Sequence, residues 1–304
     1  MNQRHHLLGA FAAMLFVGAS WGANLPVTKV MLRHFDLIPM AAVRIAVATL
    51  ALALLLWAVE GRRALRLDIG IARFLGLGLM MGGFFVIYAA GIHFSHPISA
   101  ATAGVAGPLV SAMTVRLMTG AHFDPGFGVA LALNILGGLI LVSSTFDRSA
   151  PLTLGGGEAV VLVSSAIWTI YSLKAQQWFS GASQLQRTYV ASLSATGWLS
   201  LVAVILVLAG RSASPLFVDD SWVWTQLLVV AVLAGGVGGY MWNVGASRLG
   251  VAVASLWVNL VPFCAVLFSM VYGFMPNAFQ IAGGLVALSG VVYMQWRRLR
   301  SAPR

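Results

Sequence analysis

The sequence is poor in charged residues and nearly lacks cysteine. Only 9% of its 304 residues are Asp, Glu, Lys or Arg, whereas soluble domains carry about 25%. The one cysteine, Cys264, excludes an internal disulfide and a cysteine-based metal site. The sequence contains no HExxH, GxSxG or P-loop motif and no group of metal ligands at useful spacing. We therefore expect a protein that is not an enzyme and that binds no metal and no cofactor.

The sequence consists largely of long apolar runs, and 60% of the residues are hydrophobic. A helix needs about 20 such residues to cross the hydrocarbon core of a membrane. The short connections between the runs leave no room for a soluble domain, so residues 1–304 form one transmembrane domain. The fold class predicted is an all-α integral membrane protein with ten transmembrane helices, at about 7–29, 39–59, 71–93, 97–118, 126–145, 158–178, 187–209, 222–245, 251–273 and 277–296.

The basic residues give the predicted orientation. The net charge of +10 is not gathered in one patch, which argues against a nucleic acid partner. Most Lys and Arg flank the spans on one side, as in the Arg62–Arg66 and Arg297–Arg300 segments. Since such residues stay in the cytoplasm, both termini are expected there. The first apolar run is longer than that of a signal peptide, so we expect it to be retained as a span.

The chain carries an internal repeat. Gly82, Gly91, Ala100 and Pro108 recur 154 residues later as Gly236, Gly245, Ala254 and Pro262. The repeats cover about 7–145 and 157–296, with five spans each, and an odd number of spans inverts the second repeat relative to the first. Inverted repeats are typical of transporters, which bind their solute between the halves and often use broken helices there.

Two prolines fall at equivalent places in the fourth span of each half. A proline removes a helical hydrogen bond and bends the helix, so Pro108 and Pro262 are predicted to form paired kinks. The alternative is that they are merely tolerated, because membrane helices accept proline more readily than soluble helices do.

Pairs of aromatic and polar residues are the candidate solute contacts. Trp21 and Asn24 lie three residues apart in mid-span, hence on one helix face, and Trp168 and Tyr171 repeat that spacing. Mid-span tryptophans do not fit an interfacial role, although ordinary packing between helices remains an alternative. Similar candidates on other spans are Phe84, Phe85, Tyr88, Tyr240, Asn243 and Trp257.

Charges inside the spans are few. All carboxylates lie in connections or at span ends, which argues against a cation antiporter, because such proteins hold their ion with a buried acid. The cations nearest the membrane interior are Lys29 and Arg44 at one face and Lys174 and Arg187 at the other. They either reach the lipid headgroups or act at a gate or on a substrate carboxylate.

A resemblance to a known family rests on four stretches. The first span with SWGANLPVTK, the arginine in MAAVRIAVATLALALLLW, and the paired SAATAGVAGPLVSAM and VASLWVNLVPFCAVL resemble the EamA-like, ten-helix branch of the drug/metabolite transporter superfamily. Within that branch the chain is most similar to bacterial exporters of aromatic amino acids, of the YddG type. The resemblance covers about residues 7–296.

The resemblance implies a monomeric inner-membrane protein, in contact with membrane lipid, whose spans 1–4 and 6–9 surround a cavity. It implies export of small neutral metabolites, foremost aromatic and other neutral amino acids, by alternating access. An efflux carrier for drugs or other amphipathic compounds is the main alternative, and a channel or a membrane scaffold is a more distant one.

Overall fold

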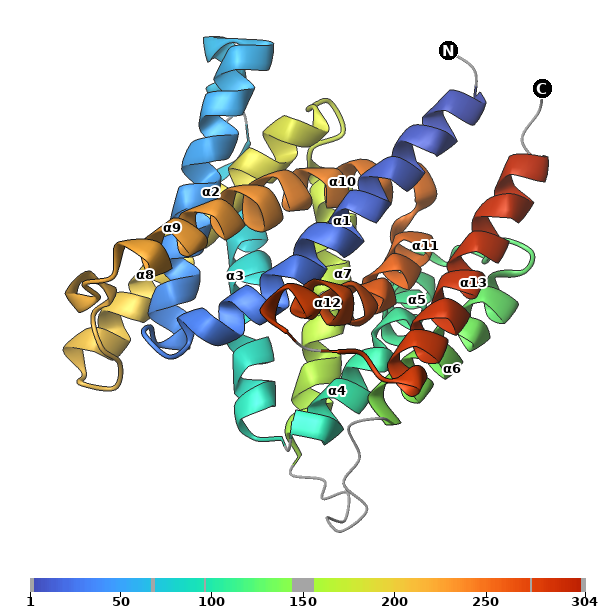
Figure 1. Ribbon diagram of the computed structural model, residues 1–304. Coiled ribbons are helices and arrows are strands. Elements are labelled where there is room, and N and C mark those ends of the chain that lie inside the picture. The colour runs from blue at the N-terminus through green and yellow to red at the C-terminus, as the bar shows by residue number, and fades with distance from the viewer. Residues whose placement is uncertain (1–2, 67–68, 96, 144–155, 274, 302–304) are drawn as a thin grey trace.

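The computed structural model describes residues 3–66, 69–95, 97–143, 156–273 and 275–301, and this part of the chain is helical without any strand (Figure 1). In the first half the helices are α1 (Gln3–Met31), α2 (Leu37–Glu60), the short η1 (Arg62–Leu65), α3 (Ile71–His93), α4 (Pro97–Val105), α5 (Gly107–Thr119) and α6 (Phe127–Ser143).

The second half is more interrupted. It contains α7 (Gly157–Trp178), α8 (Gln184–Leu208), the short η2 (Pro215–Phe217), α9 (Ser221–Val230), the π-helix η3 (Ala231–Val237) and α10 (Gly238–Leu249). The chain continues through α11 (Val251–Leu256), η4 (Trp257–Asn259), α12 (Leu260–Ser269), η5 (Met270–Tyr272) and α13 (Ala278–Ser301).

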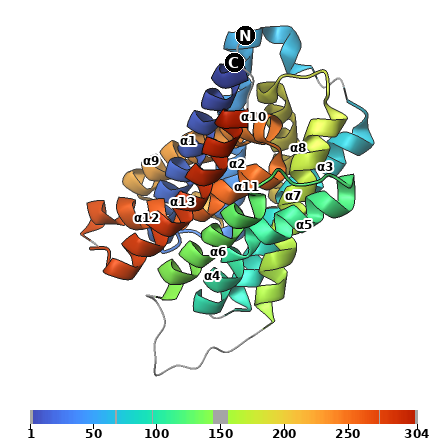
Figure 2. The same ribbon diagram turned by 90° about the vertical axis from the view of Figure 1, so that its right-hand side faces the viewer.

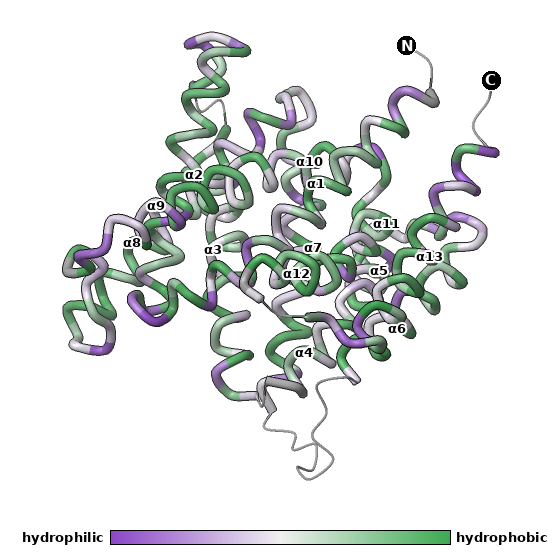
Figure 3. Tube along the Cα trace, viewed as in Figure 1, coloured by the Kyte–Doolittle hydropathy of each residue, from purple (hydrophilic) through white to green (hydrophobic). Residues whose placement is uncertain are grey.

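The helix ends follow local sequence signals. Ser183 and Asp220 precede α8 and α9, and their side-chain oxygens accept hydrogen bonds from the first free N–H groups of those helices. Gly120 ends α5 with a φ of 67°, a left-handed conformation that glycine adopts without a steric penalty. Between these ends the chain is apolar, and polar residues gather at the helix ends and connections (Figure 3).

The predicted spans all coincide with helical segments, but their lengths differ. Eight segments are long and apolar enough to cross a membrane, and α4 with α5 makes a ninth if that pair, bent by 46°, is one span. The remaining predicted span coincides with α6, whose 17 residues are fewer than the roughly 20 that a full crossing needs. A multi-pass membrane protein is thus confirmed, and ten crossings stay a prediction.

Helix packing joins the two halves of the chain rather than separating them. Helix α3 packs along α7, and α1 packs along α10; likewise α2 packs on α8 and α6 on α13. Figure 2 shows α6 and α13 side by side at one flank. Both termini lie at the same end of the bundle (Figure 1), called the termini side below.

The α6–α13 contact depends on glycine. A Cβ added to Gly137 of α6 would lie 2.2 Å from the backbone nitrogen of Ala287, and one added to Gly283 of α13 would lie 2.4 Å from that of Leu141. Backbones can approach this closely in a membrane only where side chains are absent. The two helices therefore meet backbone to backbone.

Gly137→Val should destabilise the protein, because atoms forced into a close-packed contact cost about 1–3 kcal/mol. We expect a lower midpoint of thermal unfolding in detergent. The control is Gly128→Val on the same helix, where an added Cβ meets nothing within 4 Å. Equal midpoints for the two variants would contradict the close α6–α13 contact.

Candidate functional site

Three tryptophans from three helices meet inside the bundle. Trp21 of α1 stacks on Trp242 of α10, with ring centroids 5.7 Å apart, and Trp168 of α7 lies 5.8 Å from each of them. Trp242 is only 1% exposed. The sequence pairing of Trp21 with Trp168 thus corresponds to a direct contact between the two halves of the chain.

Further rings extend this tryptophan cluster in two directions. Tyr171 lies 5.1 Å from Trp168 and is buried, and Phe84 of α3 lies 4.9 Å from Trp168 on its other side. Phe84 in turn contacts Phe85 and stacks on Tyr88, whose side chain is 41% exposed. A continuous series of rings therefore leads from the buried Trp242 to an accessible Tyr88.

Glycine and a π-helix make room for Trp21. Its indole Nε1 donates a hydrogen bond to the carbonyl oxygen of Ala234 in η3, at 3.0 Å. A Cβ added to Gly238 would lie 2.8 Å from the same Nε1, so glycine is required there. The π-helix is a feature often found at functional sites, and its second half overlaps the glycine-rich AGGVGGY stretch, Ala234–Tyr240.

Several polar atoms near the rings have no protein partner. Among the described residues, the buried atoms without a hydrogen bond include Nε1 of Trp168, Nε1 of Trp257 and Oδ1 of Asn243. Buried polar groups are nearly always satisfied. These atoms are therefore polar groups for which the described residues supply no partner.

On the termini side a polar network ties α7, α8 and α10 together. The guanidinium of Arg187 donates to Oε1 of Gln176, and Nε2 of Gln176 donates to the carbonyl oxygen of Asn243 at 3.5 Å. Nδ2 of Asn243 donates to the hydroxyls of Thr188, at 2.9 Å, and Tyr171, at 3.5 Å. The network thus reaches from the helix ends to the edge of the tryptophan cluster.

The equivalent arginine in the first half makes fewer contacts. Arg44 of α2 donates from Nη2 to Oδ1 of Asn24, at 2.8 Å, and from Nη1 to Oγ1 of Thr28, at 3.2 Å. Both partners belong to α1. The side-chain contacts of Arg44 therefore join only two helices, on the side of the bundle away from the termini.

The two lysines take no part in these clusters. Lys29 is exposed, and Lys174 bonds Gln177 and lies over the ring of Trp178 on its own helix. Two other candidates make no ring contact with the three tryptophans, although Trp257 belongs to the same buried cluster as Trp242. Tyr240 packs with Leu52, Leu56 and Leu185, and Trp257 stacks on Phe11 at 6.5 Å.

Pro108 lies next to a bend of 46° between α4 and α5, whereas Pro262 follows the 3-10 turn η4 within the helical segment Val251–Ser269, which has no comparable bend. Asparagines donate hydrogen bonds at both interruptions. Pro108 is the second residue of α5 and Pro262 the third of α12. Nδ2 of Asn259 donates to the carbonyl oxygen of Val105, the last residue of α4, at 2.9 Å. Nδ2 of Asn134 does the same for Leu256, the last residue of α11, at 2.9 Å. Each break is therefore capped by a side chain from the other half.

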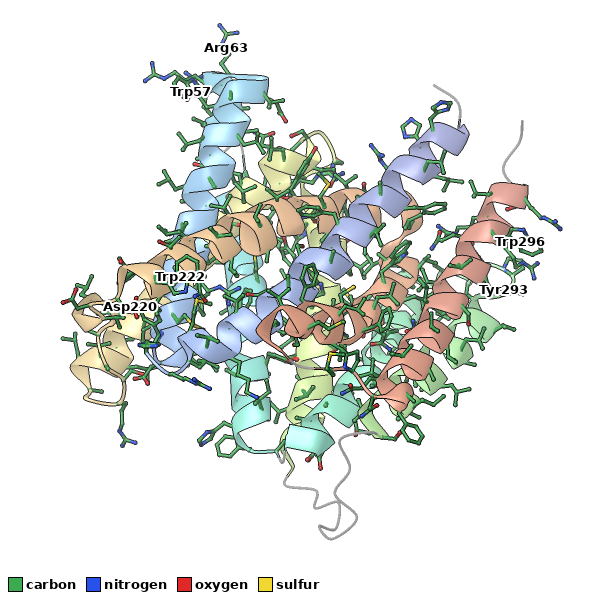
Figure 4. All side chains as sticks on the ribbon, in the orientation of Figure 1. Trp57, Arg63, Asp220, Trp222, Tyr293 and Trp296 are labelled. Carbon is green, nitrogen blue, oxygen red and sulfur yellow. The ribbon has the colours of Figure 1, made fainter. Side chains whose placement is uncertain are left out.

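Exposed tryptophans lie elsewhere. Trp57, Trp222 and Trp296 are 54%, 67% and 47% exposed and sit at or near helix ends at the margins of the molecule (Figure 4). Such rings are typical of the membrane–water interface. They contrast with the clustered Trp21, Trp168 and Trp242.

Sequence reasoning missed Trp242 and the two capping asparagines. Trp242 stands 154 residues after Tyr88, which is the offset that relates other parts of the repeat. Aligning the two halves at that offset would have identified Trp242 as the counterpart of Tyr88. Its Nε1 donates to Oγ of Ser172 at 3.0 Å. No sequence signal identified Asn134 or Asn259, because their partners are distant backbone carbonyls.

A bundle of membrane-length helices around a buried polar and aromatic cluster defines a multi-pass membrane protein with an internal site. The model of the EamA-like transporter family matches residues 7–144 and again residues 155–296. The chain therefore belongs to the EamA-like transporter family.

Relatives agree with this membership over nearly their whole length. The chain is 25% identical to "Uncharacterized transporter YrdR" of Bacillus subtilis (strain 168), covering 91% of each chain. It is 21% identical to "Uncharacterized transporter YyaM" of the same organism, covering 94% of this chain and 93% of that one. It is 23% identical to "Probable terminal-alkyne amino-acid exporter" of Streptantibioticus cattleyicolor, with 94% and 93% covered.

A solved crystal structure has a TM-score of 0.77 with this chain, at 17% sequence identity, and the match covers 96% of this chain and 97% of the other. At that identity the likeness concerns the fold alone.

Asn259→Leu should lower stability, because it leaves the buried carbonyl of Val105 without its side-chain donor. An unpaired buried group costs about 1–3 kcal/mol, so the thermal midpoint in detergent should fall. Gln177→Leu, at an exposed amide on α7, is the control and should change little. An unchanged midpoint for Asn259→Leu would show that the break needs no cap from the other half.

Proposed function

We propose that the protein exports small neutral metabolites, foremost aromatic and other neutral amino acids, across a bacterial inner membrane by alternating access. The observation that carries the proposal is the tryptophan cluster, in which Trp21, Trp168 and Trp242 from three helices and both halves converge within the bundle. Rings offer flat apolar surfaces to another ring, while the unpaired Nε1 of Trp168 and Oδ1 of Asn243 offer a donor and an acceptor.

The proposed architecture is ten helices in two inverted five-helix repeats, about 7–145 and 157–296. It is supported by the separate matches of the family model to 7–144 and 155–296. The packing supports it as well. The repeat relates α1 to α7, α2 to α8, α3 to α10 and α6 to α13, so the α3–α7 contact of one half corresponds to the α10–α1 contact of the other. The α2–α8 and α6–α13 contacts each join a helix to its own repeat partner.

The difference between the two arginine clusters supports alternating access. The Arg187 network links α7, α8 and α10 on the termini side, which fits a closed path there. On the other side the side chain of Arg44 links only α1 and α2, and the series of rings ends at the accessible Tyr88. We assign this arrangement to a state closed toward the termini. Rocking about the tryptophan cluster, with Pro108 and Pro262 as bending points, would then produce the opposite state.

The amino acid substrate is supported by the relative described as an amino-acid exporter and by the lack of any carboxylate in the interior of the described spans. A buried acid would favour cationic drugs instead.

Uptake of labelled amino acids into liposomes, with and without a proton gradient, tests the amino acid substrate. Transport of phenylalanine, tyrosine or tryptophan that saturates and shows counterflow is expected. Movement of cationic dyes without amino acids would favour drug efflux, and unsaturable flux would favour a channel.

Trp168→Ala should reduce transport of an aromatic amino acid several-fold to about tenfold or more. Each aromatic pair contributes roughly 0.5–1.5 kcal/mol, a tenfold change in affinity corresponds to about 1.4 kcal/mol, and Trp168 contacts four rings. Trp57→Ala is the control, since Trp57 is 54% exposed near the end of α2. Equal flux by the two variants at matched membrane levels would mean that Trp168 serves only packing.

The termini should both be cytoplasmic, because Arg297, Arg298 and Arg300 lie at the end of α13, and Arg63 lies at the same end of the bundle (Figure 4). Alkaline phosphatase fused after residue 304 should be inactive, and a fluorescent protein at the same place should be fluorescent. Active phosphatase would reverse the orientation.

A further inference from the structure

Arg44 is a cation within a membrane-length helix that has no carboxylate partner. Its two hydrogen bonds go to the neutral oxygens of Asn24 and Thr28. In the described part of the chain the single ion pair joins Arg298 to Asp124, at the termini side. A charged side chain within a span is costly and often marks the path of a substrate or ion, so Arg44 is a candidate to meet a negatively charged group of the solute.

The arginine at the equivalent position in the second half is different. Arg187 is 7% exposed and donates from all three nitrogens: Nε to the carbonyl oxygen of Phe179 at 2.7 Å, Nη2 to that of Ser180 at 3.2 Å, and Nη1 to Gln176. Arg44 uses only its two terminal nitrogens, and its Nε has no acceptor among the described residues. Since arginine has five N–H donors, Arg44 retains donors for a ligand.

The position of Arg44 fits an amino acid whose ring lies on the tryptophan cluster. Trp21, Asn24 and Thr28 follow one another at helical spacing on one face of α1. The guanidinium bonds the latter two, and three residues of helix span about 4.5 Å. It therefore lies between one and two turns along α1 from Trp21, which stacks on Trp242. A carboxylate attached to a bound aromatic side chain would come within reach of it.

We infer that Arg44 binds the α-carboxylate of the transported amino acid, while Asn24 and Thr28 orient its guanidinium. This rests on the proposed function and adds that a carboxylate is required. A guanidinium and a carboxylate match as a planar, two-bond pair. The binding site thereby accepts zwitterions and rejects amphipathic amines and alcohols of the same shape.

The first experiment uses the wild-type protein in liposomes with labelled phenylalanine. Competitors are 3-phenylpropionate, which keeps the carboxylate, and phenylalaninol and phenethylamine, which lack it. Phenylpropionate should inhibit uptake, and the other two should inhibit at least tenfold more weakly. Equal inhibition by all three overturns the inference while leaving amino acid transport intact.

The second experiment compares variants at matched membrane levels. Arg44→Gln should raise the KM for phenylalanine at least tenfold, about 1.4 kcal/mol, and should abolish the preference for phenylpropionate over phenylalaninol. Arg44→Lys keeps the positive charge but lacks the planar guanidinium, so its KM for phenylalanine should lie between those of the wild type and Arg44→Gln. Arg33→Gln, an exposed arginine in the neighbouring α1–α2 connection, is the control and should retain the wild-type KM and preference.

The outcomes separate the inference from a purely structural role. Arg187→Gln should slow the uptake of every substrate alike without changing the carboxylate preference. If Arg44→Gln also keeps that preference, Arg44 does not bind the carboxylate, although the proposed function survives. If the wild-type protein moves no amino acid, both are overturned. If Arg44→Gln does not fold, the competition series with the wild-type protein still tests whether binding requires a carboxylate.

Discussion

The structure depends on the pairing of backbone carbonyl groups that the broken helices expose to a medium without water. Hydrocarbon offers no hydrogen bonds, so every freed carbonyl needs a donor from the protein. At Val105 and Leu256 the donors are the side-chain amides of Asn259 and Asn134. Because each amide comes from the opposite half, the two breaks can exist only when the halves are packed together. That packing also brings Trp21 of one half onto Trp168 and Trp242 of the other.

Much of this arrangement could be predicted from the sequence, because it follows from periodicity. The apolar runs predicted where helices lie, and the spacing of Trp21 and Asn24, repeated at Trp168 and Tyr171, selected rings that do meet. The prolines likewise predicted where helices break. What escaped prediction depends on contacts between distant segments. Tyr240 was expected with the rings but packs among leucines, because the helix direction at the π-helix cannot be read from composition. The capping asparagines have partners that only the folded chain brings near.

The two halves are similar in sequence and unlike in detail. Trp21 donates its indole hydrogen to Ala234, whereas the equivalent Nε1 of Trp168 has no partner. The segment containing Ala234 is a π-helix, whereas the equivalent part of α3 is a regular α-helix. Two copies of one pattern held in different conformations are compatible with the proposed exchange between two states.

The placement of the acids has an electrical consequence. In the described part of the chain, Glu60 closes α2, Glu158 lies in the first turn of α7, and Asp124 in the connection before α6 pairs with Arg298 of α13, so these acids lie at helix ends or in connections and not in mid-membrane. A zwitterion adds no net charge of its own. Moving one elementary charge through 100 mV involves about 2.3 kcal/mol, and a neutral passage avoids that term. For a neutral solute that moves without a coupled ion, the membrane voltage would neither drive nor oppose the passage.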